Sequence, residues 1–283
     1  MASYSNTELN ATIPEIWDME LEDARYATAV IMPRISSKSD KVSKSGDIVH
    51  VTIDARLTAG NVGSNGAFTP QVTTPTSVAI TVDQHKQVAI ELEDKTDAQT
   101  FWDPFSRFPK SSGAALAEQY DTDIGALHGD ITTNVIGSSS PVTFDKTAFL
   151  GAMLKLANTN IPKTSLSFIL PPIAFYSGLL LDTQFTSASD SGQPKNVLTT
   201  GYQFNLLGVP FYLSTLLTTS GTSIKSFLLH KSALAIAMQI NNKYKYADRT
   251  AALVLSKVGV VESLYGVKTI RESHAVLINV SNQ

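Results

Sequence analysis

The sequence of 283 residues predicts an α+β fold, with strands first, helices in the middle and strands again towards the end. Apolar and polar residues alternate over residues 47–53 and 77–92, which is typical of strands with one buried face. Apolar residues instead recur every three or four positions over residues 109–128 and 145–158, which is typical of amphipathic helices. No internal repeat or clean linker divides the chain, so we expect one large domain or two small ones that share a core.

The segment between the first two strands is long and polar. Residues 57–76 contain no Lys, Asp or Glu and are rich in Gly, Ser, Thr and Asn. With its flanking strands this segment predicts a hairpin arm, and an isolated two-stranded arm is marginal in water. A structureless loop of about 20 residues is also uncommon in a compact domain unless it is functional or disordered. We therefore expect the arm to need a neighbour, which indicates a protein that binds copies of itself.

The N-terminal region predicts an extended arm followed by a helix. Residues 1–11 are polar, and residues 12–15 (Thr-Ile-Pro-Glu) combine a capping box with a proline in the first turn. Trp17 and Leu21 then follow at helical spacing, with acidic residues to the sides, and Pro33 is expected to end the element.

The remaining elements alternate between short helices and short strands. An aromatic-rich stretch over residues 97–108 is interrupted by Pro104, so the long helix is expected to begin at Pro109. Further helices are expected at residues 173–181 and 232–238, and further strands at residues 166–170, 206–214, 226–230, 251–255, 258–264 and 275–280.

Composition excludes several classes of protein. Charged residues make up 17% of the chain, below the typical value of about 25%, which indicates surface buried against other chains, although a Ser/Thr-rich surface is also well solvated. The net charge of −3 does not suit a basic nucleic-acid binder. The absence of cysteine excludes disulfides and thiolate chemistry. With no secretory signal and no sufficiently long apolar run, we expect a soluble protein made in a cytoplasm, without a membrane partner.

No catalytic constellation is visible, so we expect no enzyme activity, no cofactor and no metal. The sequence lacks a Walker loop, a dinucleotide fingerprint and a nucleophile elbow. Residues 121–125 resemble the opening of a calcium loop, but Thr132 stands where the bidentate Glu is required, which favours a solvated helix face. His50 and His85 fall on the two expected arm strands and could face each other near its base, which favours a cross-strand pair over a metal site.

Several short motifs resemble those of tailed-bacteriophage major capsid proteins. Residues 13–17 (Ile-Pro-Glu-Ile-Trp), followed by an amphipathic helix, are similar to the N-terminal segment of that family. Residues 44–51 (Lys-Ser-Gly-Asp-Ile-Val-His-Val) are similar to the start of its extended arm. Further similar stretches are residues 208–212, 228–235 and 265–271. Their order over nearly the whole chain resembles the Hong Kong 97-like capsid family.

The resemblance implies a division of the chain and a function. It implies an N-terminal arm and helix at residues 1–35, an extended hairpin arm (the E-loop) at 36–96, a spine helix with part of a peripheral domain at 97–144, an axial domain at 145–242 and peripheral-domain strands at 243–283. It implies a structural subunit of an icosahedral phage head, self-assembling as pentamers and hexamers that enclose double-stranded DNA in the virion. An encapsulin-like compartment shell is the alternative, and a soluble enzyme with a polar lid loop is a third possibility.

The resemblance also implies partners and contact residues. The main partner is the chain itself, with a separate scaffolding protein expected because only a short stretch precedes Thr12, and with portal and cement proteins as further candidates. The absence of Lys from residues 57–76 argues against the covalent Lys–Asn cross-link of some family members. Candidate inter-subunit contacts are Trp17, Leu21, Arg56 and Phe68; an intrachain core role for the first two, a solvated charge for Arg56 and a loop anchor for Phe68 stay open.

Overall fold

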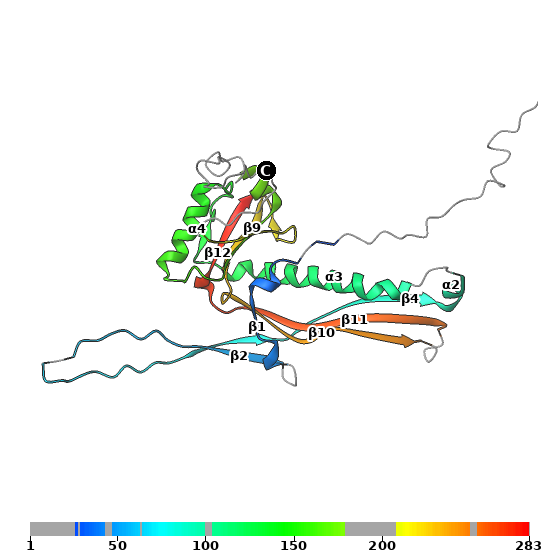
Figure 1. Cartoon of the computed structure of the whole chain (residues 1–283), viewed down its shortest axis with the longest axis horizontal. Coiled ribbons are helices and arrows are strands. Elements are labelled where there is room, and N and C mark those ends of the chain that lie inside the picture. Colours follow the sequence, from blue (N-terminus) through cyan, green and yellow to red (C-terminus); the bar gives the residue numbers. More distant parts are fainter. Residues whose placement is uncertain are drawn as a thin grey trace, which may run out of the picture.

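The computed structural model describes residues 26–27, 29–42, 47–62, 64–99, 104–178, 208–249 and 254–282. A long helix runs along one sheet, a second sheet with a shorter helix forms a neighbouring lobe, and a hairpin arm projects beyond both (Figure 1). The α+β class predicted from the sequence is therefore confirmed.

The first sheet has four strands, which are, in spatial order, β1 (Ser36–Ser37), β10 (Leu234–Asp248), β11 (Ser256–Thr269) and β4 (Gln84–Glu93). β10 and β11 form a long antiparallel hairpin, β4 pairs antiparallel with β11, and β1 pairs parallel with the start of β10. Buried and half-exposed residues alternate along much of β11, as expected for a strand with one face against a helix.

Helix α3 (Pro104–Gly125) covers one face of this sheet. Leu116, Tyr120 and Ile124, spaced four residues apart, pack into one core with Tyr265 of β11. The rings of Tyr120 and Tyr265 meet edge to face with centroids 4.8 Å apart. The Tyr120 hydroxyl donates to Ser263 Oγ at 2.6 Å, so its polar end keeps a partner inside the core.

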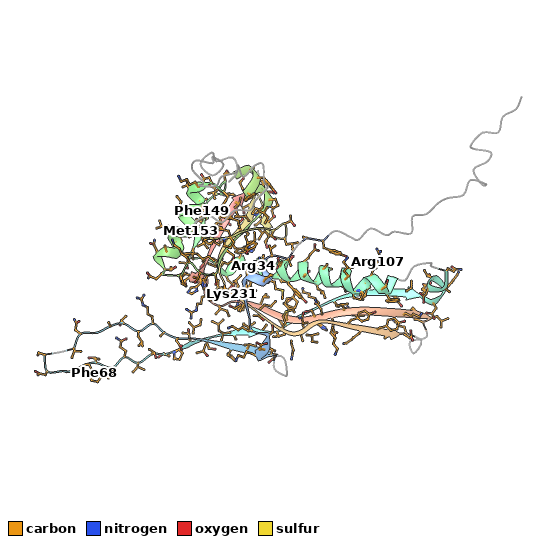
Figure 2. The ribbon with its side chains drawn as sticks, in the orientation of Figure 1. Arg34, Phe68, Arg107, Phe149, Met153 and Lys231 are labelled. Carbon is orange, nitrogen blue, oxygen red and sulfur yellow. The ribbon has the colours of Figure 1, made fainter. Side chains whose placement is uncertain are left out.

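The second sheet contains β5 (Val135–Ile136), β12 (Ala275–Ser281), β9 (Ser223–His230), β6 (Leu166–Leu170) and β7 (Phe211–Leu213) in that order, with β8 (Thr219–Ser220) also paired to β9. Helix α4 (Lys146–Asn158) packs Phe149 and Met153 into the core of this lobe (Figure 2). The Asp145 side chain accepts a hydrogen bond from the Ala148 amide and caps the helix. The helix at 145–158 and the strand at 166–170 are thus confirmed.

The two sheets share a core, as expected for two small units that do not separate cleanly. Phe227 of β9 and Leu277 of β12 pack in the same cluster as Ile236 of β10 and Tyr265 of β11. Chain segments 231–233 and 270–274 connect the two sheets, and these two segments lie side by side. The shorter elements are η2 (Met32–Arg34), η3 (Ser39–Lys41), α2 (Asp94–Gln99), η4 (Ala126–Asp130), the π-helical turn η5 (Ala174–Gly178) and η8 (Glu272–His274).

The second arm strand differs from the expectation. Residues 77–92 form two strands, because the pairing partner changes across residues 82–83: β3 (Thr76–Thr81) pairs with β2 (Ile48–Ile53) in the arm, whereas β4 pairs with β11 in the four-stranded sheet. His50 therefore lies opposite Ala79, and His85 lies opposite Leu264. The expected His50–His85 pair is wrong, since the two residues belong to different sheets.

Other expectations fail where tertiary contacts override local propensity. The Ala-rich run at 232–238 is not a helix but enters β10, because Ala233 to Met238 are all buried. α3 begins at Pro104, and Pro109 lies inside its N-terminal turns. Of the expected helix at 173–181, the described residues 173–178 are helical and end in η5. Of the expected strand at 206–214, the described part forms β7 over Phe211–Leu213. The expected N-terminal helix lies outside the described residues. Among the described helices, none has the length and apolar character to cross a membrane.

Candidate functional site

The arm is the part of the fold with the least internal support. β2 and β3 pair from Ile48–Thr81 as far as Ile53–Thr76, and an extended loop continues beyond them. In the loop, Thr58 and Gln71 still bond across the arm, with the Thr58 amide donating to Gln71 Oε1 at 3.1 Å.

Four large apolar side chains are exposed along this loop. They are Leu57, Val62, Phe68 and Val72, with exposed fractions of 65%, 68%, 75% and 93%. A projecting surface of this kind is typical of a segment that packs against another molecule.

The structure places two of the four predicted contact residues on this arm. Phe68 lies near its far end, as Figure 2 shows, and Arg56 is exposed just beyond the paired strands. Trp17 and Leu21 lie outside the described residues. The arm therefore presents Arg56 and Phe68 on a common projection, and an inter-subunit contact by either residue stays a prediction.

The root of the arm is fixed to the four-stranded sheet. Val49, Ile80 and Val82 are buried in a small cluster with Ala235 and Ala237 of β10. The arm backbone also passes directly over Gly266 of β11, where a Cβ atom would lie 1.9 Å from the Thr81 carbonyl oxygen. Only a glycine leaves room for this crossing. An isolated glycine within a strand pattern is the sequence signal for such a close approach.

Substituting Gly266 tests how firmly this crossing sets the arm. We expect Gly266→Ala to lower the free energy of unfolding by about 3 kcal/mol, because two backbones must separate and the packed root must shift. Gly113→Ala in α3 is the control: a Cβ there meets nothing within 4 Å, so a gain of up to about 1 kcal/mol in helix propensity is expected. Chemical denaturation of both variants measures the difference. Equal stability of Gly266→Ala and the unmodified chain would contradict the crossing.

The four-stranded sheet has two open edges among the described strands. At one side β1 covers only Ala235 and Ile236 of the fifteen-residue β10, and at the other side β4 is the last strand. Residues 241–248 of β10 are all exposed. Unpaired strand edges can accept another extended chain, and lysines such as Lys243 and Lys245 discourage non-specific pairing there. Within the described part of one chain, the sheet therefore has strand edges that remain unpaired, just as the arm has apolar side chains that remain exposed.

A buried carboxylate fixes the segment that precedes β1. Asp121 of α3 accepts hydrogen bonds from the backbone amides of Val30, Ile31 and Met32 at 2.5, 2.8 and 2.8 Å. Glu118, one helical turn earlier, accepts from the Ala27 amide. Asp121 is fully buried, so the expectation that residues 121–125 form a solvated helix face is wrong for it. Its charge is compensated by amide donors from a segment ninety residues away, which no local pattern reveals.

Arg34 links the same segment to the other sheet. Its guanidinium lies 3.8 Å from the centroid of the Tyr212 ring in β7, within the range of a cation–π contact. Asp121 and Arg34 thus hold residues 30–34 against both lobes.

A histidine pair lies where the two sheets connect. Ser232 Oγ is 2.7 Å from Nδ1 of both His230 and His274, and the Ser232 amide donates to His230 Nδ1 at 3.3 Å. His230 Nδ1 therefore accepts, and the Ser232 hydroxyl accepts from His274 Nδ1–H in turn. Burial, followed by the nearby Arg271 and His230, lowers the pKa of His274. The sequence distance of 44 positions hides this pair, since no periodic pattern connects its members.

The neighbouring Glu272 binds the segment 132–133 at the same connection between the two sheets. It accepts hydrogen bonds from the Thr133 amide at 2.6 Å, the Thr132 amide at 2.7 Å and the Thr132 hydroxyl at 2.9 Å. These donors hold the pKa of Glu272 at about 2, below its ordinary value of 4.5, and the Thr133 amide has the largest effect.

The two residues predict an acid-sensitive connection. His274 has a folded-state pKa below its ordinary 6.5, so stability is expected to fall as pH drops below that value. Glu272 contributes fully above pH 4.5 and loses its contribution as pH falls towards 2. Because this carboxylate is partly exposed, we expect a loss of about 1 kcal/mol. Urea unfolding across pH measures both effects. Glu272→Gln should remove the loss of stability between pH 4.5 and 2 and leave the loss that begins below pH 6.5. An unchanged profile in this variant would contradict the assignment.

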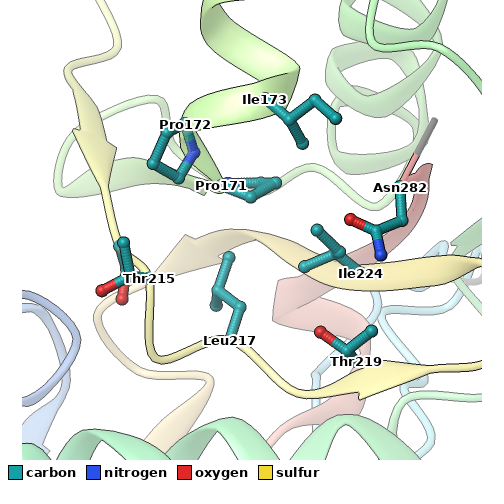
Figure 3. Close-up of a pocket in the computed structure, with 9 residues that line it drawn as sticks. Pro171, Pro172, Ile173, Thr215, Leu217, Thr219, Ile224 and Asn282 are labelled. Atoms are coloured by element: carbon teal, nitrogen blue, oxygen red, sulfur yellow. The ribbon is translucent and has the colours of Figure 1, made fainter.

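The described residues line at least two hollows. One, of about 220 Å³, lies between the Pro171–Pro172 turn, Leu217 and Ile224 (Figure 3). The other, of about 450 Å³, lies beside α4 and has Asp145 and Lys155 at its rim. Within the described ranges no group of three or more His, Asp or Glu side chains is arranged to hold a metal. Neither hollow brings together a nucleophile, a base and an oxyanion donor.

No protein-family model and no curated protein sequence matches the chain. Solved structures do match it. A chain from Mycobacterium phage Che8 is 21% identical with a TM-score of 0.78, over 94% of this chain and 96% of that one. The capsid structure of Cyanophage P-SCSP1u gives 15% identity and a TM-score of 0.80, over 97% and 95% of the two chains. The Cyanophage Pam1 capsid asymmetric unit gives 15% identity and a TM-score of 0.74, over the whole length of both chains.

The chain has the fold of phage capsid subunits. The Hong Kong 97-like architecture that the short motifs implied is confirmed at the level of the fold. Agreement over nearly the whole length of both chains includes the arm and both sheets, so the likeness does not depend on one common motif.

Proposed function

We propose that this protein is the structural subunit of an icosahedral bacteriophage head, whose pentamers and hexamers enclose double-stranded DNA. The projecting arm carries this proposal. Its exposed apolar residues and its marginal pairing require a surface that the same chain does not supply. A neighbouring subunit with an open sheet edge supplies such a surface, and main-chain pairing with that edge is a known mode of recognition.

The proposal gives each part of the fold a role. β2, β3 and the loop between them act as the extended arm, while β4, at the end of the expected 36–96 span, serves in the sheet. α3 acts as the spine helix, and the four-stranded sheet acts as the peripheral domain. The lobe with α4 and β12 acts as the axial domain. The expected boundary between residues 242 and 243 falls inside β10, all of which lies in the four-stranded sheet, so we propose a boundary before β10. β12, which falls in the expected 243–283 span, joins the axial lobe instead.

The proposal also defines partners. The chain binds copies of itself through non-covalent contacts, because residues 57–76 contain no Lys for a cross-link. A scaffolding protein, a portal and a cement protein are the further partners we propose. The net charge of −3 suits a shell that encloses DNA without binding it specifically. We propose neither an enzymatic role nor a cofactor, and we propose the virion as its location.

An encapsulin-like compartment would use the same kind of shell for cargo enzymes. The matched structures include capsids of phages, such as P-SCSP1u and Pam1, which favours the phage head.

Electron microscopy with light scattering tests the proposal on protein expressed with its neighbouring scaffold gene. We expect closed shells. DNA inside native particles supports the phage head, and enzyme cargo would overturn that assignment in favour of a compartment. A monodisperse monomer without shells would overturn both.

A further inference from the structure

The tip of the arm contains an asparagine followed by a glycine. Ser64, Asn65 and Gly66 are exposed and form a turn outside the paired strands. Gly66 has φ of 73°, in the left-handed region that glycine tolerates, and a Cβ atom there would meet nothing within 4 Å. The backbone at this point is therefore free of packing and can rearrange locally.

An Asn–Gly pair in such a turn can react without an enzyme. We propose that Asn65 is a spontaneous deamidation site in the free subunit and that assembly protects it. The Gly66 backbone nitrogen bonds to Asn65 Cγ, the Cγ–Nδ2 bond breaks, and ammonia leaves with the proton of that nitrogen. Water then opens the five-membered imide at either carbonyl, giving aspartate or isoaspartate. Water is the only co-reactant, and nothing is oxidised or reduced.

The sequence and structure make this site selective. Asn65 is the only asparagine in the chain that glycine follows. Asn61 is equally exposed in the same arm, but the β-branched Val62 follows it and crowds the attacking nitrogen. Asn134 and Asn279 are at least nine-tenths buried, and the Asn279 amide donates to the Gly137 carbonyl at 2.9 Å. Asn61 is therefore an internal control that differs chiefly in its successor.

The product would change the character of the arm. Residues 57–76 contain no ionisable side chain, so the new carboxylate would be their only charge. Isoaspartate also inserts a methylene group into the backbone and shifts the loop that carries Phe68. If the arm docks on a neighbour, as the proposed function requires, burying this unpaired charge is unfavourable. The reaction would then mark aged, unassembled subunits and exclude them from shells.

Peptide mass spectrometry on the intact chain tests the chemistry independently of assembly. After incubation of the purified free protein in mildly alkaline buffer, we expect the Asn65 peptide to exchange an amide for a carboxyl and to split into two isomers. The Asn61 peptide should stay unchanged, and Gly66→Ala should slow the reaction several-fold. An intact Asn65, or equal conversion at Asn61, would overturn the proposal.

A second measurement tests protection and rests on the proposed function. Shells and free subunits are incubated side by side, and Asn65 conversion is expected to be several-fold slower in shells. Equal conversion in intact shells would overturn the protection and show that the tip is not docked, although microscopy would still support a shell-forming protein. The absence of any shell would instead refute the proposed function and leave the free-subunit chemistry standing.

Discussion

Deleting residues 59–72 is expected to abolish shell assembly while leaving a folded subunit. The deletion removes Val62, Phe68 and Val72, which are exposed, and it spares the buried root at Val49, Ile80 and Val82. A shorter exposed loop changes the closure entropy only slightly, so we expect the free energy of unfolding to change by less than about 1 kcal/mol. Denaturation measures the folding, and electron microscopy with the scaffold counts the shells.

Point variants separate docking from loop length. Phe68→Ser removes an aromatic side chain that is 75% exposed, so it should leave the stability of the subunit unchanged and reduce the yield of shells. Gly60→Ala is the matched control, because a Cβ there meets nothing within 4 Å and the residue lies in the same loop. Normal shells from the deletion variant would mean that the arm does not hold neighbouring subunits together.

Local patterns were sufficient for the elements whose burial follows their own periodicity. The α4 stripe of Phe149, Ala152, Met153 and Leu156 recurs at helical spacing, and the structure buries all four. The arm was also predictable, since a polar, uncharged stretch between alternating strands has few other stable arrangements. These features depend on residues close together in the chain, which is why the sequence shows them.

The expectations that failed depend on distant residues. The Ala-rich start of β10 has the propensity of a helix, but pairing with β11 and with β1 makes it a strand. His230 and His274 meet only because the two segments between the sheets run side by side. The crossing of Thr81 over Gly266 likewise joins residues 185 positions apart. Arg56 and Phe68 could be chosen from the sequence as candidate contacts, but their role depends on a second copy of the chain.

Replacing Asp121 is expected to cause the largest loss of stability within the subunit. Its carboxylate accepts from three successive amides, and the amide group of Asp121→Asn would have one oxygen acceptor and would turn an N–H donor towards another donor. Leaving buried amides unsatisfied costs about 1–3 kcal/mol each, and bonds to a charged group are the stronger ones, so we expect a loss of about 3–5 kcal/mol. Denaturant unfolding measures the loss.

Glu118→Gln distinguishes the effect of the three hydrogen bonds to Asp121 from a general effect of negative charge on α3. Glu118 is only partly buried and accepts from one amide, that of Ala27, so its variant should lose about 1 kcal/mol or less. In Asp121→Asn, hydrogen exchange should accelerate first at the amides of Val30, Ile31 and Met32. A variant as stable as the unmodified chain, with those amides still protected, would show that side-chain packing of Ile31 and Ile35 holds the segment alone. Faster exchange confined to these amides would instead show that one residue of α3, through three hydrogen bonds, fixes the position of the segment that leads into β1.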